Sequence, residues 1–225
     1  MKNKNTQVFS TEKMVGIGIF SALAFVVSLV IRFPVNFLTF DAKDAVITIA
    51  SFVYGPVSGV IISFIAAFVE LITISTTGWY GFLMNFASSA TFALTASLIY
   101  TKKRDFNGAL IGLYSAVAAT VSVMLILNIF VTPLYFKYIG VPMTTADVID
   151  LIPALLLPFN FAKALMNSAI VMLLYKPLVT ALKRLNIVKT SGGAAAMTFN
   201  STTKIILGLG AAGLVVSIII FLLVK

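Results

Sequence analysis

Residues 158–167 read Pro-Phe-Asn-Phe-Ala-Lys-Ala-Leu-Met-Asn and lie inside an apolar run, Leu151 to Tyr175, whose only charge is Lys163. Such a run is long enough to cross a bilayer as a helix. Asn160, Lys163 and Asn167 follow the spacing i, i+3, i+7 and therefore share one helix face. A charge inside a bilayer costs about 3 kcal/mol or more, so we expect this face to meet protein or water rather than lipid.

The composition of the whole chain is that of an integral membrane protein. Of its 225 residues, 60% are hydrophobic and 10% are charged, and the mean hydropathy is +1.08. That balance leaves little sequence for a separate aqueous domain. Cysteine and histidine are absent, which excludes disulfides, thiol nucleophiles, imidazole bases and nearly all transition-metal sites.

The formal net charge of +9 is best explained by membrane topology rather than by nucleic-acid binding. The basic residues stand at the ends of apolar runs, where they act as orientation signals. The first apolar run, Met14 to Ile31, is followed by Arg32-Phe-Pro and not by a small-residue cleavage site. We therefore interpret this run as a retained first span and not as a cleaved signal peptide.

Apolar runs and turn signals predict six membrane segments and a seventh at the C-terminus. Tyr54-Gly55-Pro56 and the stretch 76–81 are turn signals that divide the nearly uncharged region 45–100. The predicted segments are 14–31, 42–54, 57–75, 82–100, 106–136, 152–178 and 205–224. Region 45–69 could instead form one kinked helix. The predicted fold class is an all-α membrane protein with a six-helix core and an added C-terminal transmembrane helix.

The distribution of positive charge favours two segments over one kinked helix in that region. Three basic clusters are present: Lys2, Lys4 and Lys13; Lys102, Lys103 and Arg104; and Lys183, Arg184 and Lys189. All three are cytoplasmic under the positive-inside rule only if an even number of spans separates them. Four spans before Lys102 and two more before Lys183 satisfy this condition. The N-terminus is then cytoplasmic, and loops 32–44, 76–81 and 137–150 are outside.

The predicted organisation has four parts. Residues 1–13 form a cytoplasmic N-terminus, residues 14–186 a six-span substrate-binding membrane domain, residues 187–204 a polar linker, and residues 205–225 an extra apolar segment. The expected location is a bacterial plasma membrane, which the chain crosses several times.

The sequence carries no motif that predicts an enzyme. Gly208-Leu-Gly210-Ala-Ala-Gly213 matches G-x-G-x-x-G, but it lies inside an apolar segment with no strand before it. Small residues for close helix packing explain this motif better. No phosphate-binding P-loop and no Ser/His/Asp set occur. We therefore expect neither ATP hydrolysis nor other catalysis by this chain, and no cofactor or metal.

Several polar residues inside the predicted spans have two possible roles each. Glu70 could form an ion pair with Lys163 or Arg32, or it could face a cavity. Asn85 and Asn128 could hydrogen-bond between helices or to a ligand. Lys163 could also extend to the membrane interface, since it lies close to the outer end of its span.

Four of these residues, Asn85, Asn128, Asn160 and Lys163, lie toward the outer ends of their spans. The aromatic residues Trp79 and Tyr80 fall at the same level. Amides and an ammonium group surrounded by aromatic rings suit a flat, uncharged ligand that makes several hydrogen bonds and enters from outside. Asn167 lies a turn deeper and is better explained by packing.

The sequence resembles the riboflavin-specific S component of energy-coupling factor (ECF) transporters over about residues 12–186. The resemblance lies in four stretches: Asp41-Ala-Lys43-Asp44, Tyr54-Gly55-Pro56, Thr77-Gly78-Trp79-Tyr80-Gly81-Phe-Leu-Met84-Asn85, and Asn160-x-x-Lys163. It implies a six-helix protein that binds riboflavin near the extracellular face. It also implies partners, namely a transmembrane coupling protein and two ABC-type ATPases, which supply the energy. Riboflavin is then the transported ligand and not a cofactor.

The resemblance assigns roles to particular residues. It maps the family's ligand contacts onto Asn128, Asn160 and Lys163, and residues 32–43 correspond to the family's lid. Four further residues complete the candidate ligand-binding set, namely Asn85, Asp41, Tyr80 and Trp79. Gly18-x-x-x-Ala22 corresponds to a small-residue motif that contacts the coupling protein. Spacing alone would favour internal packing for these two residues. The segment after residue 186 departs from the family pattern.

Two alternatives remain open at this point. The ligand could be another vitamin or a flavin phosphate, although a phosphate would require additional cations. The chain could also be a self-sufficient secondary transporter that uses Glu70, the only acidic residue deep in a span, as its ion-coupling group.

Overall fold

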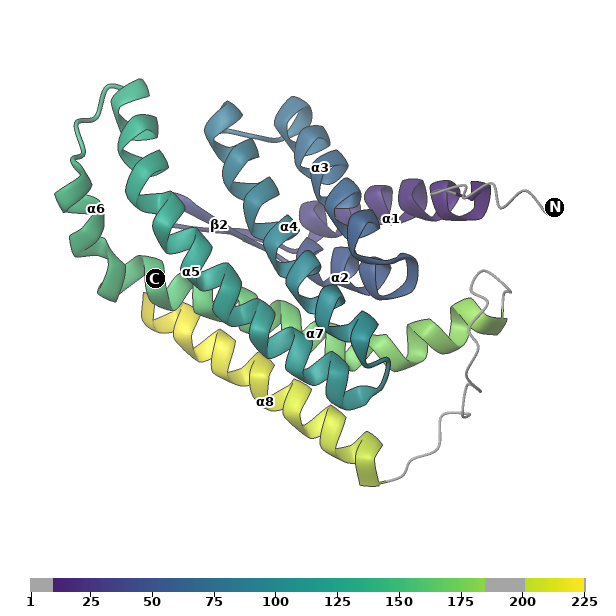
Figure 1. The fold of residues 1–225 in the computed structure, drawn as a ribbon. Coiled ribbons are helices and arrows are strands. Elements are labelled where there is room, and N and C mark those ends of the chain that lie inside the picture. Colours follow the sequence, from purple (N-terminus) through teal and green to yellow (C-terminus); the bar gives the residue numbers. More distant parts are fainter. Residues whose placement is uncertain (1–9, 185–200, 225) are drawn as a thin grey trace.

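The computed structural model describes residues 10–184 and 201–224, which form a helical membrane protein with one small hairpin (Figure 1). The helices are α1 Thr11–Val30, α2 Lys43–Tyr54, α3 Pro56–Thr73, α4 Gly78–Lys102, α5 Phe106–Tyr138, α6 Thr145–Leu151, a π-helical segment η1 Ile152–Leu156, α7 Leu157–Arg184 and α8 Ser201–Val224. The strands are β1 Arg32–Val35 and β2 Leu38–Asp41. The predicted N-terminal segment 1–13 and linker 187–204 fall largely outside the described residues.

The predicted all-α membrane fold with six core helices and a C-terminal one is confirmed. Among the described residues, five helices are long and apolar enough to cross a membrane. Helix α2 has 12 residues and is therefore about 18 Å long, which is shorter than a bilayer core of about 30 Å. Region 45–69 forms two helices, because Gly55 adopts a positive φ of 96° and Pro56 starts the next helix.

The helices alternate in direction, and Figure 1 shows which connections share a side of the molecule. The start of α1, the α2–α3 and α4–α5 connections and the end of α7 lie toward the right and lower part of that view. The hairpin and the α3–α4 and α5–α6 connections lie toward the upper and left part. The three basic clusters therefore belong to connections or ends on one side, as far as their residues are described.

Two of the three predicted outer loops, 32–44 and 137–150, contain regular structure that the sequence analysis did not anticipate. Residues 32–41 form an antiparallel hairpin in which Arg32 pairs with Asp41 and Val35 with Leu38, and Asn36 in its turn has a φ of 53°. In the loop 137–150, Thr144 and Asp147 form a capping box that starts α6. Helix α6 then continues through the π-helical segment into α7.

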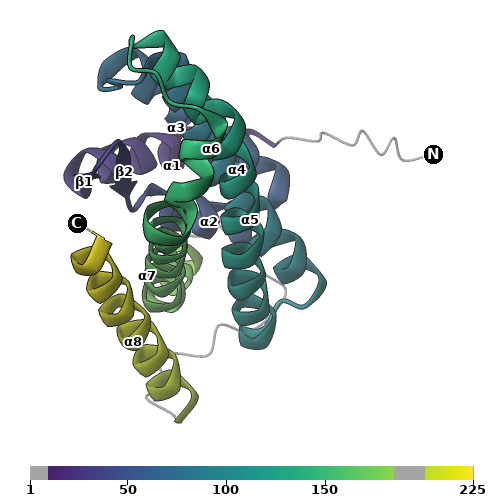
Figure 2. The same cartoon turned by 90° about the vertical axis from the view of Figure 1, so that its left-hand side faces the viewer.

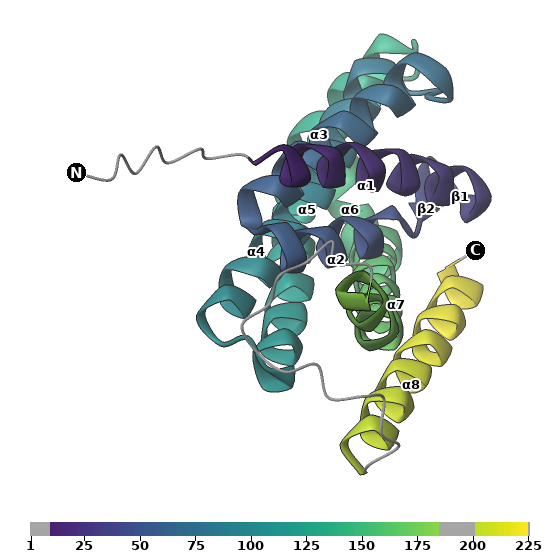
Figure 3. The ribbon, with the colours of Figure 1, turned by 90° about the vertical axis from the view of Figure 1, so that its right-hand side faces the viewer.

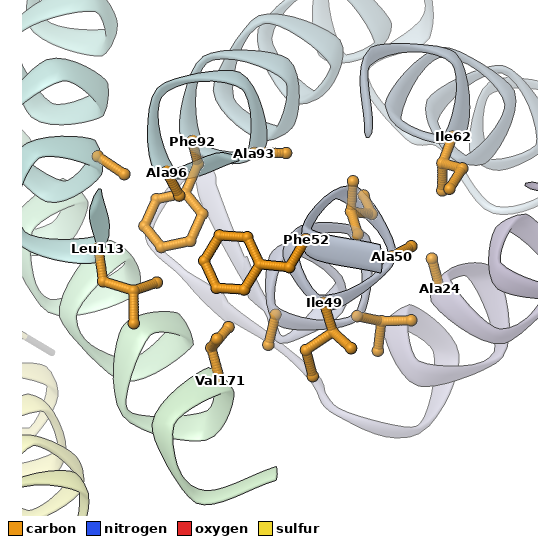
Figure 4. Packing of buried hydrophobic residues seen from close by; sticks show 14 of the residues in the cluster. Ala24, Ile49, Ala50, Phe52, Ile62, Phe92, Ala93, Ala96, Leu113 and Val171 are labelled. Carbon is orange, nitrogen blue, oxygen red and sulfur yellow. The ribbon is translucent and has the colours of Figure 1, made fainter. Parts of the chain in front are cut away.

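The largest apolar cluster lies where α1, α2, α3, α4, α5 and α7 meet (Figure 4). Alanines from three helices, Ala24, Ala50 and Ala93, are fully buried there, and they let the backbones approach closely. The rings of Phe52 and Phe92 fill the space toward α5 and α7. Buried small side chains therefore determine how close the core helices lie.

Helix α8 packs along α7, as Figures 2 and 3 both show. A Cβ atom added at Gly210 would lie 2.9 Å from Leu173, and one added at Gly213 would lie 3.2 Å from Ala169. The interpretation of the glycine motif as a helix-packing surface is confirmed at these two positions. Gly208, in contrast, has open space around its Cα.

We predict that Gly112→Ala destabilises the α4–α5 contact. A Cβ atom at Gly112 would lie 2.6 Å from the backbone oxygen of Ala96, so a helix rather than a side chain would have to move. The expected loss is about 1–3 kcal/mol, measured as a lower midpoint of thermal unfolding in detergent. Gly18→Ala is the control, because open space surrounds Gly18. Equal midpoints for Gly112→Ala and wild type would contradict this account of the contact.

Candidate functional site

A cavity with a volume of about 900 Å³, including its open mouth, lies between the hairpin and α3, α4, α5 and α7. The hairpin contributes residues 37–39, and the α3–α4 connection contributes residues 75–77. The remaining walls come from one face each of α4, α5 and α7. The cavity is therefore built from segments that are far apart in the sequence.

Two buried amides, Asn128 of α5 and Asn160 of α7, line this cavity. Each donates one N–H to its own helix, Asn128 to the oxygen of Met124 and Asn160 to that of Leu156, both at 2.7 Å. These bonds fix the orientation of both amides. Because an amide nitrogen carries two hydrogens, each side chain keeps a second donor. Among the described residues, both amides hydrogen-bond only within their own helices, so interhelical bonding does not explain them.

Lys163 also lines the cavity, and only 6% of its surface is exposed. Its Nζ donates to Oδ2 of Asp41 in β2 at 2.9 Å. The alternative in which Lys163 extends to the membrane interface is therefore wrong for this structure. The ion pair joins the end of the hairpin to α7 and holds the ammonium group at the cavity wall.

Glu70 pairs with Lys43, and the predicted partners Lys163 and Arg32 were wrong. The Lys43 Nζ lies 2.6 and 2.7 Å from the two carboxylate oxygens of Glu70, and Nδ2 of Asn85 donates to Oε2 at 3.1 Å. The sequence placed Lys43 in an exposed loop, whereas the fold buries the start of α2 so that Lys43 is 1% exposed. A buried ammonium requires a carboxylate partner, and Glu70 is that partner.

Asn167 has a structural role, as the sequence analysis proposed. It is fully buried, its Oδ1 accepts from the backbone N–H of Ala45 at 2.9 Å, and its Nδ2 donates to the backbone oxygens of Asp41 and Lys163. Helix α2 has no N-terminal side-chain cap of its own. Asn167 therefore satisfies one of its free N–H groups and fixes the end of the hairpin on α7.

The structure brings together most, but not all, of the predicted ligand-binding residues. Lining the cavity are Asn85, Asn128, Asn160, Lys163 and Tyr80. Asp41 is not part of the lining and lies behind Lys163 as its ion-pair partner. Trp79 is 68% exposed and packs against Phe82, outside the cavity. A tryptophan in this position is typical of a membrane interface.

Sequence reasoning missed several residues of the cavity wall. Thr132 and Tyr135 lie on the same side of α5 as Asn128, and Thr132 donates to Oδ1 of Asn128 at 2.9 Å. The i, i+4 and i, i+7 spacing from Asn128 could have identified both. Thr39 was missed because its position depends on the hairpin, which no pattern in the sequence predicted.

Gly18 and Ala22 lie on the exposed face of α1. The internal packing of this helix comes from other residues, among them Ile17, Phe20 and Ala24. Internal packing, which spacing alone favoured for Gly18 and Ala22, therefore does not account for them in the described part of the chain.

The arrangement suits binding rather than catalysis. Among the described residues there is no group of His, Cys, Asp or Glu side chains that could hold a metal ion. Two of the three charged side chains that line the cavity are paired, Lys163 with Asp41 and Glu70 with Lys43, and the third is Arg32 of β1. What remains for a ligand is a set of amide, hydroxyl and ammonium hydrogen-bonding groups between aromatic and apolar side chains.

We predict that Asp41→Asn destabilises the protein much more than Asp105→Asn. Removing one partner of a buried ion pair costs about 3–5 kcal/mol. Asp105 forms an exposed ion pair with Lys103 at 3.6 Å, and such pairs contribute about 0–1 kcal/mol. Thermal or denaturant unfolding in detergent measures both changes. Similar losses for the two variants would contradict the structural role of the buried pair.

The same pair predicts a pH dependence. Burial raises the pKa of the Asp41 carboxyl, but the ammonium groups of Lys163 and Lys43 outweigh this effect and hold the pKa at about 2, below the ordinary 3.8. The ionised carboxylate therefore stabilises the fold at neutral pH. The stability difference between wild type and Asp41→Asn should shrink as the pH falls from about 4 toward 2.

Comparison with known proteins shows which family this chain resembles. The family described as "ECF transporter, substrate-specific component" matches residues 12–175. The chain is 34% identical to the riboflavin transporter RibU of Staphylococcus aureus (strain TCH60) over 183 residues, which cover 77% of this chain and 94% of that protein. It is 26% identical to the riboflavin transporter FmnP of Bacillus subtilis (strain 168), over 73% of this chain and 90% of that protein.

A solved structure agrees with the fold. The chain is similar to the S component of a bacterial ECF transporter, with a TM-score of 0.63 and 32% identity over 77% of this chain and 98% of that one. These relatives are transporter components and not enzymes, in agreement with the prediction from the sequence. The matched family segment ends at residue 175 and so excludes α8. From residue 12 to residue 175, the chain belongs to the family of substrate-specific components of ECF transporters.

Proposed function

We propose that this protein is the riboflavin-binding component of an ECF-type vitamin uptake system. The observation that carries the proposal is the cavity itself, in which Asn128, Asn160 and Lys163 converge between aromatic side chains. The relatives from Staphylococcus aureus and Bacillus subtilis, both named riboflavin transporters, support the choice of ligand.

The chemistry of the cavity matches that of riboflavin. Its flat ring system presents carbonyl oxygens and ring nitrogens along one edge, and its ribityl chain presents hydroxyls. The free N–H groups of Asn128 and Asn160 and the ammonium of Lys163 can donate to these acceptors. Tyr80, Tyr135 and Phe159 offer aromatic surface for the ring. The bonds from each amide to its own helix orient these donors before the ligand arrives, which reduces the entropy lost on binding.

The proposed orientation has the N-terminus in the cytoplasm and the hairpin and cavity near the outer face. The positive-inside rule supports it, because the described residues of the three basic clusters belong to helix ends and connections on the side opposite the hairpin. In this orientation the cavity is open to a vitamin from outside the cell. The division into residues 1–13, 14–186, 187–204 and 205–225 is part of the same proposal.

The two alternatives are less well supported. For a flavin phosphate, the cationic side chains at the cavity are Arg32 and Lys163, and Lys163 is already paired with Asp41, while Glu70 adds a negative group. For a secondary transporter, Glu70 would have to exchange protons or ions. Its carboxylate already accepts three hydrogen bonds, two from Lys43 and one from Asn85, and serves as the partner of a buried ammonium group.

We predict that Asn128→Ala and Asn160→Ala each weaken riboflavin binding about 10–100-fold, because each removes a hydrogen-bond donor in a buried site. Lys163→Ala together with Asn160→Ala should abolish binding and the yellow colour of the purified protein. Quenching of riboflavin fluorescence measures the affinity. Asn107→Ala is the matched control, since Asn107 is an exposed asparagine on the same helix as Asn128.

Two outcomes would contradict the proposal. A wild-type protein that remains colourless and does not quench riboflavin fluorescence would exclude riboflavin as the ligand. Riboflavin 5′-phosphate that competes more strongly than riboflavin itself would show that the site is built for a flavin nucleotide.

The energy for uptake is proposed to come from partners, a coupling membrane protein and two ABC-type ATPases, because the sequence has no P-loop. Gly18 and Ala22 on the exposed face of α1 are the proposed contact with the coupling protein, since small residues permit close helix approach.

We predict that Ala22→Leu strongly reduces riboflavin uptake by cells that express the complete transporter, and leaves riboflavin binding to the isolated protein unchanged. The leucine side chain would keep the partner helix at a greater distance. Ala118→Leu, on the exposed face of α5, is the control and should leave uptake unchanged. Normal uptake with Ala22→Leu would show that this face of α1 does not form the proposed contact with the coupling protein.

A further inference from the structure

The end of α8 contacts the hairpin, and Figures 2 and 3 both show this proximity. The residue that makes the contact is Phe221, which is 6% exposed, whereas its neighbours Leu222 and Leu223 are 71% and 80% exposed. Among the described side chains of the last helical turn, that of Phe221 is therefore buried against the rest of the protein.

Phe221 lies at the centre of an aromatic cluster that joins three segments. Its ring centroid lies 4.8 Å from that of Phe40 and 5.5 Å from that of Phe33, both in the hairpin, and 5.8 Å from that of Phe159 in α7. All three contacts are edge-to-face, the favoured geometry for aromatic pairs. Phe221 thus connects both strands of the hairpin to α7.

The hairpin that Phe221 holds is also a wall of the cavity. Its residues Phe37, Leu38 and Thr39 line the cavity, and so does Phe159. The hairpin has a second attachment, the ion pair between Asp41 and Lys163 at the end of β2. The Phe221 contacts act on Phe33 and Phe40, the cross-strand pair next to Asp41, and therefore reach both strands, whereas the ion pair holds β2 alone. If they are lost, the hairpin keeps the ion pair at Asp41 and the contact of Phe37 with Phe136 of α5, but both strands lose their attachment to α8 and can move away from the cavity.

Helix α8 packs closely on α7, and this packing places Phe221 against the hairpin. Gly210 and Gly213 allow close contact with Ala169 and Leu173, and Ser217 is fully buried one turn before Phe221. These residues and Phe221 fall on one face of the helix by their spacing. Because α8 follows the family segment 12–175, this attachment is an addition to the shared core.

We propose that α8 is a strap that holds the hairpin closed over the cavity, and that Phe221 is the positioning residue that slows ligand release. Loss of its ring frees the hairpin and raises the dissociation rate, with a smaller effect on the association rate. The strap itself follows from the packing of α8, and only the identity of the ligand rests on the proposed function.

The first test measures hairpin closure without any ligand. Because the chain has no cysteine, Val35→Cys introduces a single thiol at a hairpin position that is 3% exposed in the closed arrangement. We expect Phe221→Ala to raise the rate of maleimide labelling at this thiol about tenfold or more. Leu222→Ala is the control on the same helical turn and should leave the rate unchanged. Phe221→Leu retains apolar volume and should restore much of the protection.

The second test measures riboflavin release by stopped-flow fluorescence in full-length protein without the added cysteine. Phe221→Ala should raise the dissociation rate about tenfold, Phe221→Leu should give an intermediate rate, and Leu222→Ala should match wild type. The order wild type, Phe221→Leu, Phe221→Ala is expected in both tests. If Phe221→Ala does not fold, Phe221→Leu provides the comparison.

The outcomes separate the two proposals. Equal labelling and release rates for wild type and both Phe221 variants would overturn the strap, whatever the ligand. A wild-type protein that binds no riboflavin would overturn the proposed function, and the labelling experiment would still decide on the strap.

Discussion

Two buried ion pairs, Lys163 with Asp41 and Lys43 with Glu70, join the hairpin and the start of α2 to α7 and α3. A buried charge without its partner is strongly destabilising, so each lysine requires its carboxylate. Asn85 and Asn167 complete the network by hydrogen bonds to Glu70 and to the backbone at Asp41. These polar contacts hold the segments that surround the cavity in one relative arrangement, and apolar packing alone does not supply that specificity.

The same network determines what the cavity offers to a ligand. The carboxylates compensate the lysines, so the site does not carry a strong excess of either charge. The amides of Asn128 and Asn160 are oriented by bonds to their own helices. A rigid, nearly neutral, hydrogen-bonding site of this kind favours an uncharged polar molecule. In the proposal, helix α8 also affects ligand release, because Phe221 at its end packs against the β1–β2 hairpin, which forms part of the cavity wall.

Much of the fold and part of the site could be predicted from local sequence. The six core segments, the break at Gly55 and Pro56, and the packing role of Gly210 and Gly213 all follow from hydrophobic runs, turn chemistry or small-residue spacing. The partner of Glu70 could not be predicted, because Lys43 was assigned to an exposed loop. Trp79 was assigned to the cavity because it falls at the same level as Tyr80 and the polar residues, yet successive residues on a helix point in different directions.

By itself, the sequence determined the membrane class, the number and direction of the core helices, and the helix face that carries Asn160 and Lys163. These properties depend on composition and on the periodicity of neighbouring residues. Only the tertiary structure decided that Lys163 meets Asp41, 122 residues away, and that Phe221 closes on the hairpin. Such contacts depend on how distant segments pack, and a hydrophobicity pattern specifies which side of a helix is buried without specifying what it is buried against.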